Sequence, residues 1–226
     1  MSAAARVVTE MTLRELGRRR TVLILLVLLP LSFYLARRDL PGQSLRMLEL
    51  GLGWAVSTLA LFSTVAARDL DQRLRVAGAR VRDIALGRLV AVVAIGLVLG
   101  VSYAVLVALD QDFHPYDGVL VGLGVVVVVG APLGMALGAI LPKELEGALA
   151  LMVVLAVQML ADPAELLAKV LPFWAVPEIG YYTVDGAGQD YLWRGVAHAG
   201  VSVAVLCTVA AVAAAARLRL VKLPEP

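Results

Sequence analysis

The stretch Ala67–Arg88, ARDLDQRLRVAGARVRDIALGR, contains six arginines and three aspartates, and it separates two long apolar runs. These runs extend over Leu45–Ala66 and Leu89–Leu109. About 20 consecutive apolar residues are enough for a helix to cross the roughly 30 Å hydrocarbon core of a bilayer. The pattern therefore predicts a polar connection between two membrane-spanning helices.

The composition of the whole chain agrees with this interpretation. Of 226 residues, 61% are hydrophobic and 17% are charged, and the mean hydropathy is +0.87. Soluble domains contain roughly 45–50% apolar and about 25% charged residues, so an ordinary soluble domain is excluded. The net charge of +2 says little about partners, and with Cys207 as the single cysteine the chain can form no internal disulfide.

Six apolar segments predict an all-α, polytopic membrane protein with six transmembrane helices. They are Thr21–Leu35, Leu45–Ala66, Leu89–Leu109, Val119–Leu141, Gly147–Ala161 and Val196–Ala216. The first and fifth would extend only about 22 to 24 Å as helices, so their flanks must complete the crossing. The expected organisation is a cytoplasmic elbow segment at 1–20, a transmembrane domain at 21–216 and a cytoplasmic tail at 217–226.

The distribution of basic residues predicts the orientation. With the N-terminus in the cytoplasm, fifteen Lys and Arg residues flank the spans on the inside and five on the outside. This fits the positive-inside rule and places both termini in the cytoplasm. Most Trp and Tyr residues then fall near the outer interface, which such side chains favour. The excess of Arg over Lys, together with abundant Ala, Val, Leu and Gly, hints at a bacterial origin and hence the bacterial plasma membrane.

Two further segments carry recognisable patterns. The outer segment 162–195 contains Pro163, Pro172 and Pro177, which predict short, broken helices in the outer leaflet above a cavity; the alternative is a surface loop on the outer face. In the fourth span, glycines recur every four residues at 130, 134 and 138, which favours close helix packing over a transport role. Pro132 between them can bend that helix.

As a helix, the opening stretch would be amphipathic. Its apolar face would hold Leu70, Leu74, Ala77, Val81 and Ile84, opposite a face of Arg and Asp residues. Gly78 in the middle predicts two short helices joined at a bend. The aspartates among the arginines favour a surface that contacts protein over one that contacts only lipid headgroups.

Three stretches together resemble the membrane-spanning permeases of the ABC transporter type-2 family. MTLRELGRRRTVLILLVLLPL, Met11–Leu31, is similar to the family's basic elbow leading into a proline-containing first span. RVRDIALGRLVA, Arg80–Ala91, resembles the start of its third span, with Asp83 before the pair Gly87 and Arg88. LPFWAVPEIGYY, Leu171–Tyr182, resembles its outer re-entrant region. The chain departs from the family at 71–73, where DQR replaces a frequent Glu-Gly-Thr, and at Gly78, where a proline is frequent.

The resemblance implies that the loop 67–88 is the coupling helix, which docks on a cytoplasmic ATPase. Its coupling residues would be Leu74, Gly78, Arg80, Val81, Arg82, Asp83 and Ile84. Of these, Leu74, Val81 and Ile84 would fill a groove on the ATPase, and the charged residues would fix the register. Two ATPase subunits, a second permease half that is identical or homologous, and the lipid bilayer are the implied partners. No nucleic acid is expected.

The chain lacks the motifs of a catalyst. None of its lysines follows a phosphate-binding glycine loop, so ATP and Mg²⁺ would be bound by the partner ATPase, and this chain is expected to hold no cofactor, to bind no metal and not to be an enzyme. His198 and Ser202 share a helix face, but without a nucleophile motif a polar packing contact is the favoured interpretation.

We expect an ATP-driven exporter subunit for a hydrophobic or amphipathic substrate such as a drug, antibiotic or lipid. The candidate substrate-path residues are Glu49, Trp54, Pro132 and Trp174. Glu49 lies inside the second span, where an ionisable group raises a functional hypothesis; pairing with Arg46, three residues earlier, is the favoured alternative. Two other functions stay open: an ATP-independent membrane scaffold or assembly factor, and an ion-coupled carrier that uses Glu49.

Overall fold

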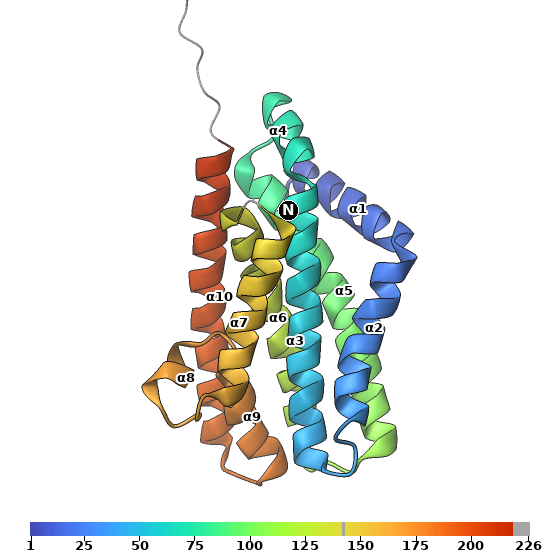
Figure 1. The fold of residues 1–226 in the computed structure, drawn as a ribbon, viewed down its shortest axis with the longest axis vertical. Coiled ribbons are helices and arrows are strands. Elements are labelled where there is room, and N and C mark those ends of the chain that lie inside the picture. The colour runs from blue at the N-terminus through green and yellow to red at the C-terminus, as the bar shows by residue number, and fades with distance from the viewer. Residues whose placement is uncertain (142, 219–226) are drawn as a thin grey trace, which may run out of the picture.

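The computed structural model describes residues 1–141 and 143–218, and these form helices and connections without a strand (Figure 1). The helices are α1 (Ala3–Arg18), α2 (Arg20–Leu35), α3 (Pro41–Ala66), α4 (Arg68–Val76), α5 (Val81–Asp110), α6 (Asp117–Ile140), α7 (Glu144–Leu160), α8 (Leu166–Val170), α9 (Ala175–Val184) and α10 (Gln189–Arg217). Residues 219–226 of the predicted cytoplasmic tail, which include the inner basic residues Arg219 and Lys222, lie outside the described residues.

Within the described chain, four helices are long and apolar enough to cross a membrane: α3, α5, α6 and α10. Each of the six predicted apolar segments falls on a helix, so the all-α class is confirmed, and the four long apolar helices fit a membrane-embedded protein. However, α2 has 16 residues and α7 has 17, which correspond to about 24 to 26 Å. Six complete spans therefore stay a prediction.

The helices α3 and α6 form the centre of the bundle, and the glycines of α6 bring their backbones together. A Cβ on Gly130 would lie 3.0 Å from the Gly53 carbonyl oxygen, and one on Gly138 would lie 2.9 Å from that of Leu61. A Cβ on Gly134 would collide with the Ser57 carbonyl oxygen. The predicted packing role of the glycine spacing is thus confirmed.

The N-terminal helix α1 lies across one end of the bundle and packs on the first turns of α5 (Figure 1). Its buried residues are Ala5, Val8, Thr12 and Leu16, which are spaced as one helical face. The Thr9 hydroxyl donates to the Gly87 carbonyl at 3.0 Å. A Cβ on Gly87 would lie 2.6 Å from the Ala5 carbonyl oxygen, so the close approach depends on glycine at this position.

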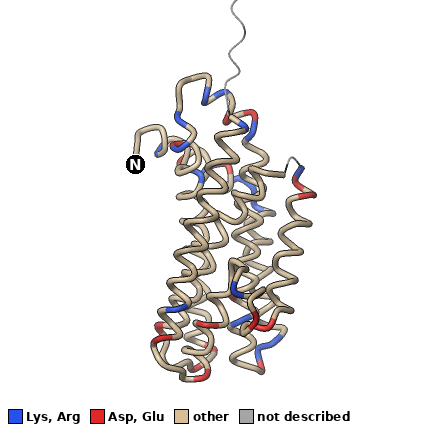
Figure 2. The backbone as a smooth tube through the Cα atoms, turned by 90° about the vertical axis from the view of Figure 1, so that its left-hand side faces the viewer, with Lys and Arg blue, Asp and Glu red and all other residues tan. Residues whose placement is uncertain are grey.

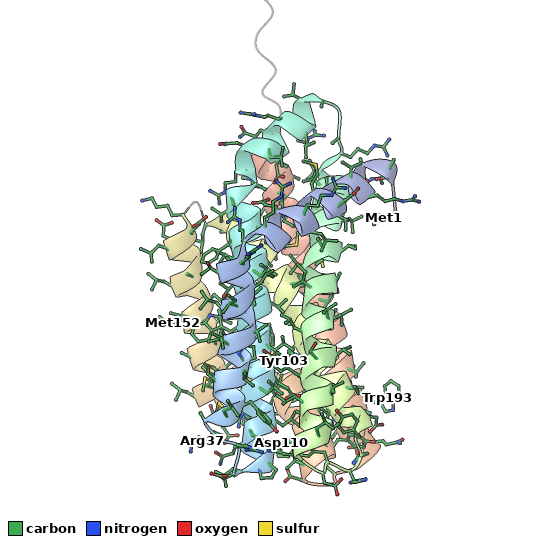
Figure 3. All side chains as sticks on the ribbon, turned by 90° about the vertical axis from the view of Figure 1, so that its right-hand side faces the viewer. Met1, Arg37, Tyr103, Asp110, Met152 and Trp193 are labelled. Carbon is green, nitrogen blue, oxygen red and sulfur yellow. The ribbon has the colours of Figure 1, made fainter. Side chains whose placement is uncertain are left out.

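Charged residues gather at the two ends of the bundle and leave a long uncharged middle (Figure 2). The N-terminal helix, α4 and the last turn of α10 share one end, which we call the α4 end (Figure 1). Arg37, Asp110 and Trp193 lie at the opposite end (Figure 3), which we call the α9 end. The uncharged middle is the part that a bilayer would surround.

The α9 end is capped by the segment between α7 and α10. This segment contains the short helices α8 and α9, as the prolines predict. Pro177 does not interrupt α9 because it occupies the third position of the helix, where its missing N–H has no intrahelical acceptor. The residues of α9 pack against α3, α6 and α10, so α9 belongs to the bundle and is not a surface loop.

Candidate functional site

The charged stretch folds as a helix, a turn and the beginning of a second helix. Helix α4 ends at Val76, and α5 begins at Val81. Gly78 lies between them with φ at +91°, a left-handed conformation that glycine adopts without a steric penalty. The predicted bend is therefore present. The second piece is not a short helix but the start of the 30-residue α5, so Leu70 and Ile84 share no common helical face.

A buried ionic cluster fixes α4 to the bundle. The Arg88 guanidinium on α5 donates to Asp71 through Nη2 at 2.7 Å and through Nη1 at 3.1 Å. The Arg217 Nη2 on α10 donates to the same carboxylate at 3.3 Å. The Asp71 side chain is 1% exposed. Because removing one partner of such a pair leaves an uncompensated buried charge, Asp71 holds α5 and α10 together at this end.

A second arginine of α4 contacts the end of α6. Arg68 Nη2 donates to the Gly138 carbonyl at 2.8 Å and also to the Leu141 carbonyl. The last carbonyls of a helix lack intrahelical donors, so the guanidinium satisfies groups that would otherwise be unpaired. We refer to Arg68, Asp71, Arg88 and Arg217 as the anchor cluster. It connects α4 to α5, α6 and α10.

Of the seven predicted coupling residues, five are at least partly exposed and two are buried. Gly78, Arg80 and Arg82 are exposed, and Leu74 and Val81 are half-buried. Asp83 is buried and accepts a hydrogen bond from the Ser2 hydroxyl at 2.8 Å. Ile84 is 2% exposed. These last two side chains therefore pack within the chain, because α1 and the bundle cover the first turn of α5, and Ile84 does not present an apolar surface to a partner.

Sequence reasoning missed two features of this region. Val76 at the end of α4 is 77% exposed, and the exposed Leu70 and Arg73 lie on the same helix. The amphipathic pattern did not identify Val76, because the break at Gly78 ends the helical face. The anchor cluster was missed for a different reason. The amphipathic pattern places Asp71 on the polar face of the helix, and no local feature of the sequence pairs it with Arg217, 146 residues away.

The four predicted substrate-path residues do not line a common path. Trp54 borders a cavity of about 270 Å³ beside α1 and α2, and Pro132 borders one of about 250 Å³ near Cys207. The Trp174 indole donates to the Pro163 carbonyl at 2.9 Å and lies edge-on to His198, with ring centroids 5.1 Å apart. Glu49 lines a third, larger cavity.

This outer cavity, of about 420 Å³, lies at the α9 end between α3 and α9. Residues 40–46 and Glu49 form one wall, residues 176–185 contribute the other, and Pro163 completes it. Cavities of roughly 300 to 1,000 Å³ are typical of small-molecule sites. Its walls are mainly apolar, with charges from Arg46, Glu49 and Asp185.

Glu49 is 2% exposed, and its carboxylate forms no hydrogen bond or ion pair with any residue that the structure describes. The predicted ion pair with Arg46 is therefore not formed at contact distance, although Arg46 lines the same cavity and its charge acts on Glu49. Instead, Oε1 packs against Gly122 of α6, where a Cβ would collide with it. The sequence identified this residue and Arg46 as the charge that acts on it, but not the contact of Glu49 with α6.

The cap contains a second buried acid, which is paired. Glu178 lies 3.3 Å from Arg194 Nε, and the Arg194 guanidinium is 4.1 Å from the centre of the Tyr191 ring. Burial raises the pKa of Glu178, and the positive charge of Arg194 partly opposes this effect. His198 Nε2 lies 2.9 Å from the Lys169 carbonyl oxygen, a polar packing contact between α10 and α8.

The described residues contain no group of three His, Cys, Asp or Glu side chains that could hold a metal ion. Comparison of the chain with known proteins finds no matching family model and no match among curated proteins. The functional interpretation therefore depends on the geometry of the two ends. One end has a charged helix, α4, and the other has a cavity.

Proposed function

We propose that this protein is the permease subunit of an ATP-driven exporter of the ABC type-2 kind. The observation that carries the proposal is the anchor cluster, which joins a short, partly exposed helix to three membrane-embedded helices. A motor protein that moves α4 would therefore move the ends of α5, α6 and α10 with it. The interior is apolar enough for the substrate class expected above, a hydrophobic or amphipathic molecule.

In this proposal α4 and the turn after it form the surface that docks on the ATPase. Leu70 and Val76 supply apolar contacts, and Arg73, Arg80 and Arg82 supply positive charge. An apolar centre with a charged rim is the usual anatomy of a specific protein interface. Asp83 and Ile84 act from inside, because Asp83 binds the Ser2 hydroxyl at the start of α1 and Ile84 is buried in the bundle.

The remaining parts of the proposal follow from this docking. Two ATPase subunits bind ATP and Mg²⁺, and a second permease half, identical or homologous, completes the transmembrane path. The protein lies in a bacterial plasma membrane with both termini in the cytoplasm, α1 is the elbow helix, and α8 and α9 are the re-entrant helices. The excess of Lys and Arg around the α4 end supports this orientation.

The test is a substitution at the exposed tip of α4. The chain is co-expressed with a Walker-type ATPase encoded by an adjacent gene, and Val76→Asp is compared with Leu145→Asp, which changes an exposed residue of α7 at the same end. We expect Val76→Asp to reduce co-purification of the ATPase at least about tenfold, as the loss of an interface anchor does. Leu145→Asp should leave co-purification unchanged.

Equal recovery of the ATPase with both variants would contradict the proposed docking surface. Binding of α4 to a protein without nucleotide-dependent change would favour the scaffold alternative.

The ion-coupled carrier is kept as a second candidate because Glu49 is buried without a partner. It makes a distinct prediction. Transport would then follow a proton gradient in vesicles without any ATPase, and Glu49→Gln would abolish it.

A further inference from the structure

Glu49 lines the outer cavity, and its carboxylate forms no hydrogen bond or ion pair with a described residue, although the more distant charge of Arg46 acts on it. Glu49 is nine residues into α3, so it lies about 12 Å along the helix axis from Pro41. The exposed side chains of Leu40 and Val184 border the cavity nearer the end of the bundle. Glu49 therefore lines the inner part of the cavity, and the exposed side chains of Leu40 and Val184 form the mouth of the cavity.

The carboxylate is held between three helices. Glu49 extends from α3 towards α6, where its Oε1 contacts the Cα side of Gly122. A Cβ on Gly122 would also lie 3.6 Å from Ile179 of α9, so α9 closes the third side. The absence of a side chain at Gly122 leaves room for the carboxylate, and the surrounding helices leave it few alternative positions.

An ionised carboxylate in an apolar setting is costly unless a positive charge or hydrogen-bond donors reach it. Glu178, the other buried acid of this end, has Arg194 for that purpose. Glu49 has no equivalent, because Arg46 forms no ion pair with it among the described residues. The two acids on the cavity wall, Glu49 and Asp185, outnumber the one arginine, so the lining has a net negative formal charge when Glu49 is ionised.

We propose that the outer cavity binds an amphiphile with a primary ammonium group. The ammonium pairs with the Glu49 carboxylate, and the apolar part of the ligand contacts Leu45, Val176 and Val184. A charge-assisted hydrogen bond of this type is stronger than one between neutral groups. An anionic or neutral ligand would leave Glu49 without a counter-charge. The inference does not depend on ATP-driven transport, since it concerns binding by this chain alone.

The experiment measures binding of monodansylcadaverine to the full chain in dodecyl maltoside, an uncharged detergent. The readout is energy transfer from the tryptophans, of which Trp174 directly precedes α9. The comparison ligand is the same probe with its amine acetylated, which keeps the size and removes the charge. This ligand pair tests the proposal on the unchanged protein, so the result does not depend on the folding of any variant.

We expect saturable binding of the amine and at least about tenfold weaker binding of the acetylated probe, the loss that one charge-assisted contact of roughly 1.5 to 3 kcal/mol implies. Glu49→Gln, which keeps the shape of the side chain, should weaken binding of the amine by the same factor. Asp185→Asn, at the exposed mouth, should change it less than about threefold.

Equal binding of the two probes, or unchanged binding of the amine to Glu49→Gln, would overturn the inference. Competition experiments then identify the source of the ammonium. Displacement of the probe by phosphatidylethanolamine assigns the cavity to a lipid headgroup, whereas displacement by dodecylamine alone assigns it to a free amphiphilic amine. Loss of ATPase docking in the Val76→Asp experiment would leave these results unaffected.

Discussion

At the scale of single residues, the charged side chains of this protein divide into surface pairs and buried ones. The pair Arg14–Glu10 is largely exposed, whereas Arg88–Asp71 is almost fully buried. Exposed pairs contribute little because water and salt screen them. In a buried pair each partner offsets the desolvation of the other, so the loss of one leaves the other uncompensated. Stability at the α4 end should therefore depend on Asp71 far more than on Glu10.

We predict that Asp71→Ala lowers the free energy of unfolding by about 3 to 5 kcal/mol, because Arg88 is left as an unpaired buried charge. Glu10→Ala should cost only about 0.3 to 0.5 kcal/mol. The measurement is equilibrium unfolding of the detergent-solubilised protein. A double-mutant cycle with Arg217→Ala should show coupling to Asp71 of about 0.5 to 3 kcal/mol, and additive effects would exclude the proposed link between α4 and α10.

At the scale of helices, the close contact between α3 and α6 depends on small residues in register. Gly134 meets the backbone of α3 directly, whereas Gly124, ten residues earlier on the same helix, has open space around its Cβ position. In a membrane, where lipid tails are as apolar as the side chains, such backbone approach is a main source of helix association. The same substitution at the two glycines can therefore test how much this backbone contact contributes to stability.

We predict that Gly134→Ala destabilises the protein by about 1 to 3 kcal/mol, the usual cost of overpacking, because its Cβ would collide with the Ser57 carbonyl oxygen. Gly124→Ala should be neutral or slightly stabilising, because alanine favours a helix over glycine by about 1 kcal/mol. Thermal unfolding followed by circular dichroism distinguishes the two variants. Equal melting temperatures would show that α3 and α6 separate without cost.

At the scale of the whole molecule, the two ends differ in charge and in the structural features that they contain. The α4 end holds the anchor cluster and most of the basic residues, and the α9 end holds the outer cavity and its cap. Because basic flanks are retained in the cytoplasm, the proposed orientation places α4 inside the cell and the cavity mouth outside.

This orientation predicts opposite labelling of two introduced cysteines in a Cys207→Ser background. Asp112, whose side chain is 91% exposed between α5 and α6, lies at the α9 end, so Asp112→Cys should react with a membrane-impermeant maleimide on intact cells. Val76→Cys, at the tip of α4, should react only after the membrane is permeabilised. Labelling of Val76→Cys on intact cells would show that the topology is the opposite of the proposed one, and it would contradict docking on a cytoplasmic ATPase.

The all-α class of the protein and the approximate positions of its helices could be predicted from the amino-acid sequence alone. A run of consecutive apolar residues is a local feature of the sequence, so it locates a helix that a membrane could surround. The spacing of Gly130, Gly134 and Gly138 is also local, and it indicates a packing face. The prolines of 162–195 and Gly78 mark breaks in helices for local steric reasons. The sequence also singled out Glu49, since a charge inside an apolar run is visible without a fold.

The sequence could not show which charges meet and which surfaces remain exposed, because both depend on how the helices pack. Asp71 is buried because α5 and α10 bring Arg88 and Arg217 to it. Glu49 is buried because α6 packs against α3, with Gly122 beside the carboxylate. Ile84 is buried for a similar reason, although its spacing suggested an exposed face. These outcomes depend on contacts between residues far apart in the chain, and local periodicity contains no information about such contacts.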